Sequence, residues 1–199
     1  MNENRDTVRV WDLPTRLFHW SLVAAVAAAW ITAEVLDDRW LAPHYWIGYA
    51  VAGLLLFRLV WGLIGSEHSR FASFAYGPRR VLAHLRDLLG RRAGHYLGHN
   101  PAGAAMIFAL LTLLALLVVT GLVAQGGAEH AGPLAGWVGT RVGHAAEELH
   151  EGLFVALLVL VAGHLGGVAL ESLLSRQNLV RAMVTGRKAR PAGPQPDGT

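Results

Sequence analysis

The sequence predicts an all-α integral membrane protein in which four helices cross the bilayer as a bundle. Three observations support this fold class. Of the 199 residues, 53% are hydrophobic and 16% are charged, whereas a typical soluble domain is about 25% charged. Four apolar stretches are long enough to cross a bilayer as helices. The chain has no cysteine, which excludes disulfides, thiolate metal sites and cysteine-held iron–sulfur clusters.

The first predicted span covers residues 15–34. Asp12 and Pro14 precede it as signals for the start of a helix. A cleaved signal peptide is an alternative, because arginines precede an alanine-rich apolar stretch. Trp30 interrupts that stretch and three further spans follow, so we favour a membrane helix.

The second predicted span covers residues 44–65 and is followed by a polar segment, residues 66–101. Within this segment we expect an amphipathic helix over residues 78–89 that lies on the membrane surface. Its arginines lie away from an apolar face formed by Val81, Leu82, Leu85, Leu88 and Leu89.

The third span, residues 102–124, contains no charged residue and no histidine, which is typical of scaffold. A glycine-rich link, residues 125–143, leads to the fourth span at 146–172. We treat residues 1–175 as one transmembrane domain. Residues 176–199 form a cytoplasmic tail whose end, rich in Pro and Gly, is expected to be disordered.

The basic residues predict the orientation of the spans. The N-terminal tail, residues 66–101 and the C-terminal tail hold all but four of the 17 Lys and Arg. Because basic segments stay on the cytoplasmic side, both termini are expected there. The links 35–43 and 125–147 then face the periplasm of a bacterial inner membrane. The arginines flank apolar spans rather than one soluble face, so nucleic acid is not an expected partner.

Four histidines are predicted to form two pairs at different depths in the membrane. His150 and His164 lie on one span, 14 residues apart, which corresponds to about 21 Å in height and about 40° around the helix. In the predicted topology, His44 is level with His150 near the periplasm, and His19 is level with His164 near the cytoplasm. A buried imidazole is costly unless it is satisfied, so such histidines are functional candidates.

Facing pairs of neutral imidazoles are how a helix bundle holds non-covalent haem iron. Zinc or non-haem iron would need more ligands, and Glu151 points about 100° away from its neighbour His150. Hydrogen bonds from the histidines to neighbouring helices are the structural alternative. Small residues beside His164 leave room for a flat macrocycle, although they also permit close helix packing; they are Gly163, Gly166 and Gly167.

The other histidines are expected in links or at the aqueous boundary, as surface or capping residues. His144 precedes the fourth span but lies about 200° around the helix from His164. The remainder are His68, His84, His95, His99 and His130.

Several motifs together resemble the bacterial cytochrome b561 family and the related b-type cytochrome subunits of membrane hydrogenases. They are VWDLPTRLFHW, HYWIGY, RLVWGLIGSEHSRF, GHNPAG, LHEG, GHLGG and NLVRAMVTGRK. The resemblance covers nearly all of the chain outside its ends. It implies a four-helix protein with two haem b groups, one bound by His19 and His164 and the other by His44 and His150. It also implies exchange of electrons with ubiquinone or menaquinone and with a partner outside the membrane.

We therefore expect an electron carrier between the quinone pool and a periplasmic cytochrome or dehydrogenase subunit. A superoxide:ubiquinone oxidoreductase is an alternative, although acidic residues outnumber basic ones in the periplasmic links, where a cationic funnel would attract this anion. A haem-free membrane scaffold or solute carrier is the third alternative.

Arg58 is a charged residue well inside the second span, where insertion of an arginine costs about 2.5 to 3.5 kcal/mol. It follows His44 by 14 residues and so lies on nearly the same helix face, about 21 Å lower. We expect Arg58, helped by Arg16, to bind a haem propionate on the cytoplasmic side. The alternative is that the Arg58 side chain extends to lipid phosphate.

Overall fold

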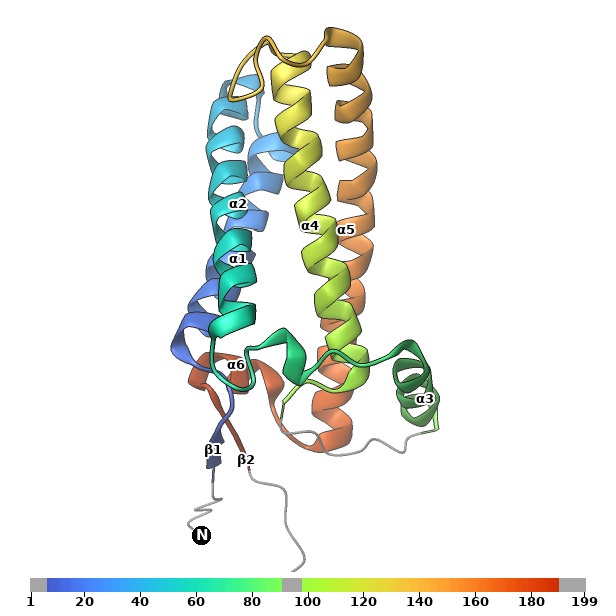
Figure 1. Ribbon diagram of the computed structural model, residues 1–199. Helices are drawn as coiled ribbons and strands as arrows, with labels where there is room; N and C mark the ends of the chain where they lie inside the picture. Colours follow the sequence, from blue (N-terminus) through green and yellow to red (C-terminus); the bar gives the residue numbers. More distant parts are fainter. Residues whose placement is uncertain (1–6, 91–97, 190–199) are drawn as a thin grey trace, which may run out of the picture. The chain divides into compact units, whose positions relative to one another are not determined.

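The computed structural model describes residues 7–90 and 98–189 (Figure 1). The part of the tail predicted to be disordered falls on residues 190–199, outside the described residues, and stays a prediction. The described part of the chain forms two compact units that interleave in sequence. Unit 1 comprises Met1–Arg16, Trp61–Ala105 and His164–Thr199, and unit 2 comprises Leu17–Val60 and Met106–Gly163.

In the described part of the chain, four long helices are apolar enough to cross a membrane, which confirms the predicted all-α membrane fold. The first is α1, which continues into the π-helical turn η1. Their bounds are Leu13–Trp30 for α1, Ile31–Val35 for η1, Leu41–Ile64 for α2, Pro101–Gly127 for α4 and Thr140–Ser175 for α5. A short 3-10 turn, η2 (Asp38–Trp40), precedes α2.

Segments of all four helices pack together in unit 2 (Figure 1). Leu113, Leu114 and Leu117 of α4 form a buried cluster with Leu157 of α5. Partly buried side chains surround this cluster, namely Leu22 and Val26 of α1, Leu55 of α2, Leu110 of α4, and Leu153, Phe154, Leu160 and Val161 of α5. The uniformly apolar third span therefore lies at the centre of the packing within this unit.

The glycine-rich link between α4 and α5 is shorter than the sequence predicted. It covers residues 128–139, because α4 extends to Gly127 and α5 begins at Thr140. A Cβ added at Gly143 would lie 2.2 Å from the backbone nitrogen of Ala128, closer than any real Cβ contact. Glycines that suggested a loop thus allow two helix backbones to touch.

Unit 1 joins the two ends of the described chain in a two-stranded antiparallel sheet. Strand β1 (Thr7–Arg9) pairs with β2 (Arg187–Ala189), with Val8 opposite Lys188. Helix α6 (Leu179–Thr185) precedes β2 and ends at Gly186, which has a φ of 79°. This left-handed conformation favours glycine. The first part of the tail is therefore folded.

Lys188 of β2 contacts the segment that precedes α4. Its Nζ donates a hydrogen bond to the Gly98 carbonyl oxygen at 3.2 Å and lies 5.4 Å from the centre of the Trp11 ring. Burial lowers the pKa of Lys188, and the charge of Glu171 partly opposes this shift. The buried cation and the aromatic ring hold the two strands against the rest of unit 1.

Helix α3 (Pro78–Leu89) follows the short 3-10 turn η3 (Phe71–Ser73). Leu82 and Leu85 are exposed, as expected of a helix that lies against lipid, whereas His84 is only 4% exposed. The prediction that His84 is a surface or capping residue was therefore wrong, because α3 turns this histidine, rather than Leu82 or Leu85, toward the protein. The location of α3 on the membrane surface stays a prediction.

Asp12 ties the start of α1 to the segment that follows α2. Its carboxylate accepts a hydrogen bond from the backbone nitrogen of Thr15 at 2.8 Å, the geometry of a helix N-cap. It also accepts hydrogen bonds from Trp61 Nε1 at 3.0 Å, Ser66 Oγ at 2.6 Å and Ser69 Oγ at 2.9 Å. Burial raises the pKa of Asp12, but the hydrogen bonds from Ser66, Thr15 and Ser69 outweigh it and hold the pKa well below its ordinary value.

Asp12→Asn is expected to lower the thermal midpoint at neutral pH, because the amide cannot accept all of these hydrogen bonds. A carboxylate whose pKa is lowered by folding stabilises the protein above the unfolded pKa of about 3.9, and this stabilisation is lost as the pH falls below it. The difference in midpoint between wild type and Asp12→Asn should therefore narrow from pH 6 to pH 3 in detergent.

The exposed carboxylate of Asp87 provides the control, and Asp87→Asn should leave the midpoint unchanged. A difference between wild type and Asp12→Asn that stays constant with pH would show that Asp12 does not act through its charge.

Candidate functional site

The structure brings His44 and His150 together inside unit 2. His44 lies in the first turns of α2 and His150 lies in α5. Their ring centres are 6.2 Å apart and their ring planes cross at 81°. Two helices that are distant in sequence therefore bring two imidazoles close together, at the pair of positions that the sequence placed at equal depth.

Each of these two imidazoles is fixed through its Nδ1 atom. His44 Nδ1 lies 3.0 Å from the carbonyl oxygen of Ala29, and His150 Nδ1 lies 3.0 Å from that of Leu117. A carbonyl oxygen only accepts hydrogen bonds, so Nδ1 carries the hydrogen in both rings. Nε2 is then the nitrogen with the lone pair, which is the atom that binds a metal.

The spacing of the rings fits one metal ion bound by both of them. A bond of about 2.0 Å from a metal to an imidazole nitrogen, added to about 1.1 Å from that nitrogen to the ring centre, places two ring centres about 6.2 Å apart across the metal. His44 and His150 lie at 6.2 Å. With the hydrogen on Nδ1, both rings offer the neutral donor that haem iron takes on its two axial sides.

A π-helical turn lies beside the partner of His44. In η1 the Leu36 nitrogen bonds to the Ile31 carbonyl oxygen at 3.1 Å, five residues back. Just before this turn, the Ala29 carbonyl oxygen accepts hydrogen bonds from His44 and, at 3.0 Å, from Thr32 Oγ1. Such turns are frequent at functional sites, and the hydrophobic periodicity of the first span does not predict this one.

Gly121 of α4 makes room for the ring of His150. A Cβ added at Gly121 would lie 3.1 Å from Cε1 and 3.3 Å from Nδ1 of His150. The ring thus rests against the helix backbone. The uncharged sequence of this span predicts scaffold, yet α4 supplies both the carbonyl and the space that fix His150.

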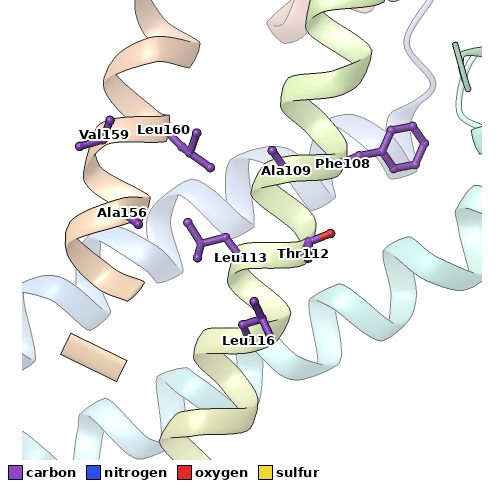
Figure 2. A pocket seen from close by; sticks show the side chains of 8 residues that line it. All are labelled: Phe108, Ala109, Thr112, Leu113, Leu116, Ala156, Val159 and Leu160. Carbon is purple, nitrogen blue, oxygen red and sulfur yellow. The ribbon is translucent and has the colours of Figure 1, made fainter. Parts of the chain in front are cut away.

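An apolar groove of about 750 Å³ lies between α4 and α5 in unit 2. Figure 2 shows Leu113 and Leu160 pointing toward each other across it, with Phe108 pointing away from α5. On α5 the groove includes Val159, nine residues after His150 and so about 180° around the helix from it. Its lining contains no side chain that binds iron, so the candidate metal site lies at the histidine pair.

The pairing of His19 with His164 stays a prediction, because these residues belong to different units. His19 lies on α1 in unit 2, with its ring centre 5.0 Å from that of Trp20. His164 lies on α5 where the sequence of unit 1 resumes. Both side chains are half-buried. Helix α5 is continuous from His150 to His164, so the spacing expected along this helix is present.

The two arginines expected near haem propionates have different surroundings. Arg58 lies on α2 and is only 4% exposed, which favours a buried partner over lipid phosphate. The Arg16 guanidinium donates a hydrogen bond to the carbonyl oxygen of Val184, near the end of α6. Arg16 therefore helps to hold the tail, and a contact between Arg16 and a propionate stays a prediction.

The other histidines differ in their exposure and in their contacts. His144 is exposed and pairs with Glu147 at 3.2 Å. His99 is held between aromatic rings, with its ring centre 4.4 Å from that of Trp11 and 4.6 Å from that of Phe74. His99 is therefore a packing residue rather than the surface or capping residue that was expected. His95 lies outside the described residues.

Four apolar helices, with two neighbouring imidazoles whose Nε2 atoms are available, define a membrane cytochrome that holds haem without a covalent link. The chain belongs to the prokaryotic cytochrome b561 family, whose model matches residues 10–186. It is thus a multi-pass protein of the bacterial membrane that uses haem b and takes part in electron transfer.

Curated relatives are similar to this chain along most of their length. A probable Ni/Fe-hydrogenase B-type cytochrome subunit from Bradyrhizobium diazoefficiens is 26% identical over 92% of this chain and 87% of its own. Proteins of the same description from Azotobacter chroococcum and Cupriavidus necator are 28% and 27% identical, over 90% and 89% of this chain and 87% and 85% of their own. No solved structure matches the chain significantly.

Gly121→Val is expected to reduce the ratio of haem to protein, because the added side chain would displace the ring of His150 from α4. Haem content after purification, measured as the pyridine haemochrome, provides the test. Gly53→Val is the control, since a Cβ at Gly53 meets nothing within 4 Å. Equal haem content in both variants would show that the contact between Gly121 and His150 is not required.

Proposed function

We propose that this cytochrome binds two haem b groups and conducts electrons across the membrane between quinone and a periplasmic redox partner. The observation that carries the proposal is the pair His44 and His150, with both Nδ1 atoms fixed by carbonyl groups and ring centres 6.2 Å apart. His44 and His150 hold one haem, and His19 and His164 hold the other.

The second haem is supported by the continuity of α5. His150 and His164 belong to one unbroken helix and are separated by about 21 Å along its axis, at nearly the same rotation. One helix thus contributes a ligand near each membrane surface. Haem supplies one-electron exchange, and the two sites divide the membrane thickness into shorter transfers.

The histidines and arginines have distinct roles in this proposal. Two imidazoles would hold the iron of each haem, and this ligation would suit electron transfer rather than binding of a small ligand. The buried Arg58 guanidinium balances the charge of a propionate at the His19 and His164 site. Ubiquinone or menaquinone exchanges electrons on the cytoplasmic side, where that site lies in the predicted topology.

The partner is inferred from the relatives. Their printed description as Ni/Fe-hydrogenase B-type cytochrome subunits supports a redox enzyme subunit of the hydrogenase type as the periplasmic partner. Such a subunit would exchange electrons at the end of the bundle that holds His44 and His150.

Charge at this end disfavours superoxide as a substrate. Arg39 is held by Asp37, with its Nε 3.1 Å from the carboxylate, so its charge is largely balanced. Glu129 lies in the link before α5, and Glu147 and Glu148 lie in the first turns of α5. An acidic surface repels a small anion and slows its arrival.

His44→Ala and His150→Ala should each leave about one haem per chain, where the wild type holds two. Removing one axial ligand exposes an unpaired imidazole and an iron with an open position, so that haem dissociates. The pyridine haemochrome gives the number of haems per chain.

His144→Ala is the matched control, since His144 is exposed and pairs with Glu147, and it should retain both haems. One haem in the wild type would contradict the proposal. Two haems in both His44→Ala and His150→Ala would contradict the assigned ligands.

Arg58→Gln should lower the midpoint potential of one haem, because a propionate without its cation favours the ferric state. A redox titration followed by absorbance measures both potentials, and His19→Ala identifies the wave of the cytoplasmic haem. Arg141→Gln, at the exposed start of α5, should shift neither potential appreciably. If Arg58→Gln leaves both waves in place, Arg58 does not bind a propionate; if only the other haem shifts, the two depths are reversed.

A further inference from the structure

The ring of His150 packs against one turn of α4. His150 Nδ1 lies 3.0 Å from the carbonyl oxygen of Leu117 and 3.1 Å from the hydroxyl oxygen of Thr120. The ring edge also lies against Gly121, where a Cβ would come within 3.1 Å of Cε1. One helical turn thus supplies an acceptor, a hydroxyl and the space for the ring.

The donor and the acceptor of each hydrogen bond between His150, Thr120 and the α4 carbonyls can be assigned. The Thr120 hydroxyl donates to the carbonyl oxygens of Leu116, at 2.9 Å, and Leu117, at 3.1 Å. Because the carbonyl of Leu117 requires a hydrogen on His150 Nδ1, the Thr120 oxygen accepts from the same N–H. One imidazole N–H is therefore shared between two acceptors. Thr120 is only 8% exposed, so bulk water does not compete for this hydrogen bond.

His44 has a similar arrangement around its Nδ1. This nitrogen donates to the carbonyl oxygen of Ala29, which also accepts from Thr32 Oγ1, just as the Leu117 carbonyl accepts from His150 Nδ1 and Thr120 Oγ1. At His150 the threonine oxygen also lies 3.1 Å from the imidazole Nδ1 itself. Because an N–H that donates more strongly makes the opposite ring nitrogen a more basic ligand, this contact strengthens His150 as an electron donor.

We propose that Thr120 is a positioning residue that fixes the ring of His150 and lowers the midpoint potential of the haem held by His44 and His150. This inference rests on the proposed function, since it concerns that haem. The Thr120 hydroxyl acts through the imidazole and does not touch the iron. A more basic Nε2 donates more charge to iron and stabilises the ferric state.

A purely structural role for Thr120 predicts a different result. Threonine in a membrane helix often bonds to the carbonyl four residues back, as Thr120 does with Leu116. Loss of that bond would change stability but would not move a redox potential. Measuring both the midpoint potential of the haem and the stability of the protein therefore distinguishes a positioning role of Thr120 from a purely structural one.

The test compares three variants of the full-length, haem-loaded protein in detergent. Thr120→Val removes the hydroxyl at nearly constant volume, and Thr120→Ser retains it. Thr112→Val is the matched control, because Thr112 lies two turns earlier on the same helix and lines the apolar groove. Potentiometric titration gives both midpoint potentials, and the wave missing from His44→Ala identifies the relevant haem. Electron paramagnetic resonance of the ferric protein reports the orientation of the axial ligands.

Thr120→Val should raise the potential of this haem, shift its ferric resonance signal and leave the other haem unchanged. Thr120→Ser should match the wild type, as should Thr112→Val. Two haems with both potentials and both signals unchanged in Thr120→Val would overturn the role of Thr120 while leaving the proposed function intact. A wild-type protein without a haem that depends on His44 and His150 would instead overturn the proposed function itself.

Discussion

The need to satisfy both nitrogens of an imidazole inside an apolar bundle governs the site in unit 2. A ring nitrogen buried without a partner is costly, and a neutral imidazole has one donor and one acceptor. Backbone carbonyls of neighbouring helices take the donor of His44 and of His150. The acceptor nitrogen of each ring is then left for a metal. The hydrogen bonds that lower the cost of burial are the same ones that select the tautomer able to bind iron.

The same requirement explains which residues occur on helices that contribute no histidine to this site. Helix α4 has no histidine, yet it provides the Leu117 carbonyl, the Thr120 hydroxyl and the open backbone at Gly121. Nearby, Tyr49 of α2 donates a hydrogen bond to Gln125 of α4, which ties the ligand helix to the supporting one. Glycine contacts between α4 and α5 complete this end of unit 2, because only residues without a Cβ allow such close backbones.

The sequence predicted the features that depend on position along the membrane normal. Depth is fixed by helix rise and by the distribution of arginines, so His44 and His150 could be placed at one level from spacing alone. The same reasoning could not reveal the Ala29 and Leu117 carbonyls, because every residue has a carbonyl and only the rotation of each helix decides which one faces an imidazole. Nor could it detect η1, since a π-helical turn changes the register without requiring a distinctive residue. The glycines of residues 125–143 were ambiguous because loops and close helix contacts favour the same residue.

In unit 1, hydrogen bonds and charge contacts of single polar side chains hold the short strands in place of an apolar core. Its strands have three residues each, too few to be stable alone, and the structure holds them through single polar side chains. Asp12 collects hydrogen bonds from Thr15, Trp61 and the serines after α2, while Lys188 joins β2 to Trp11 and Gly98. Each is a charge whose burial is costly unless its partners are in place, so the folding of the tail depends on the segments after α2 and before α4. Both ends of the described chain are thereby fixed to the segments between the helices.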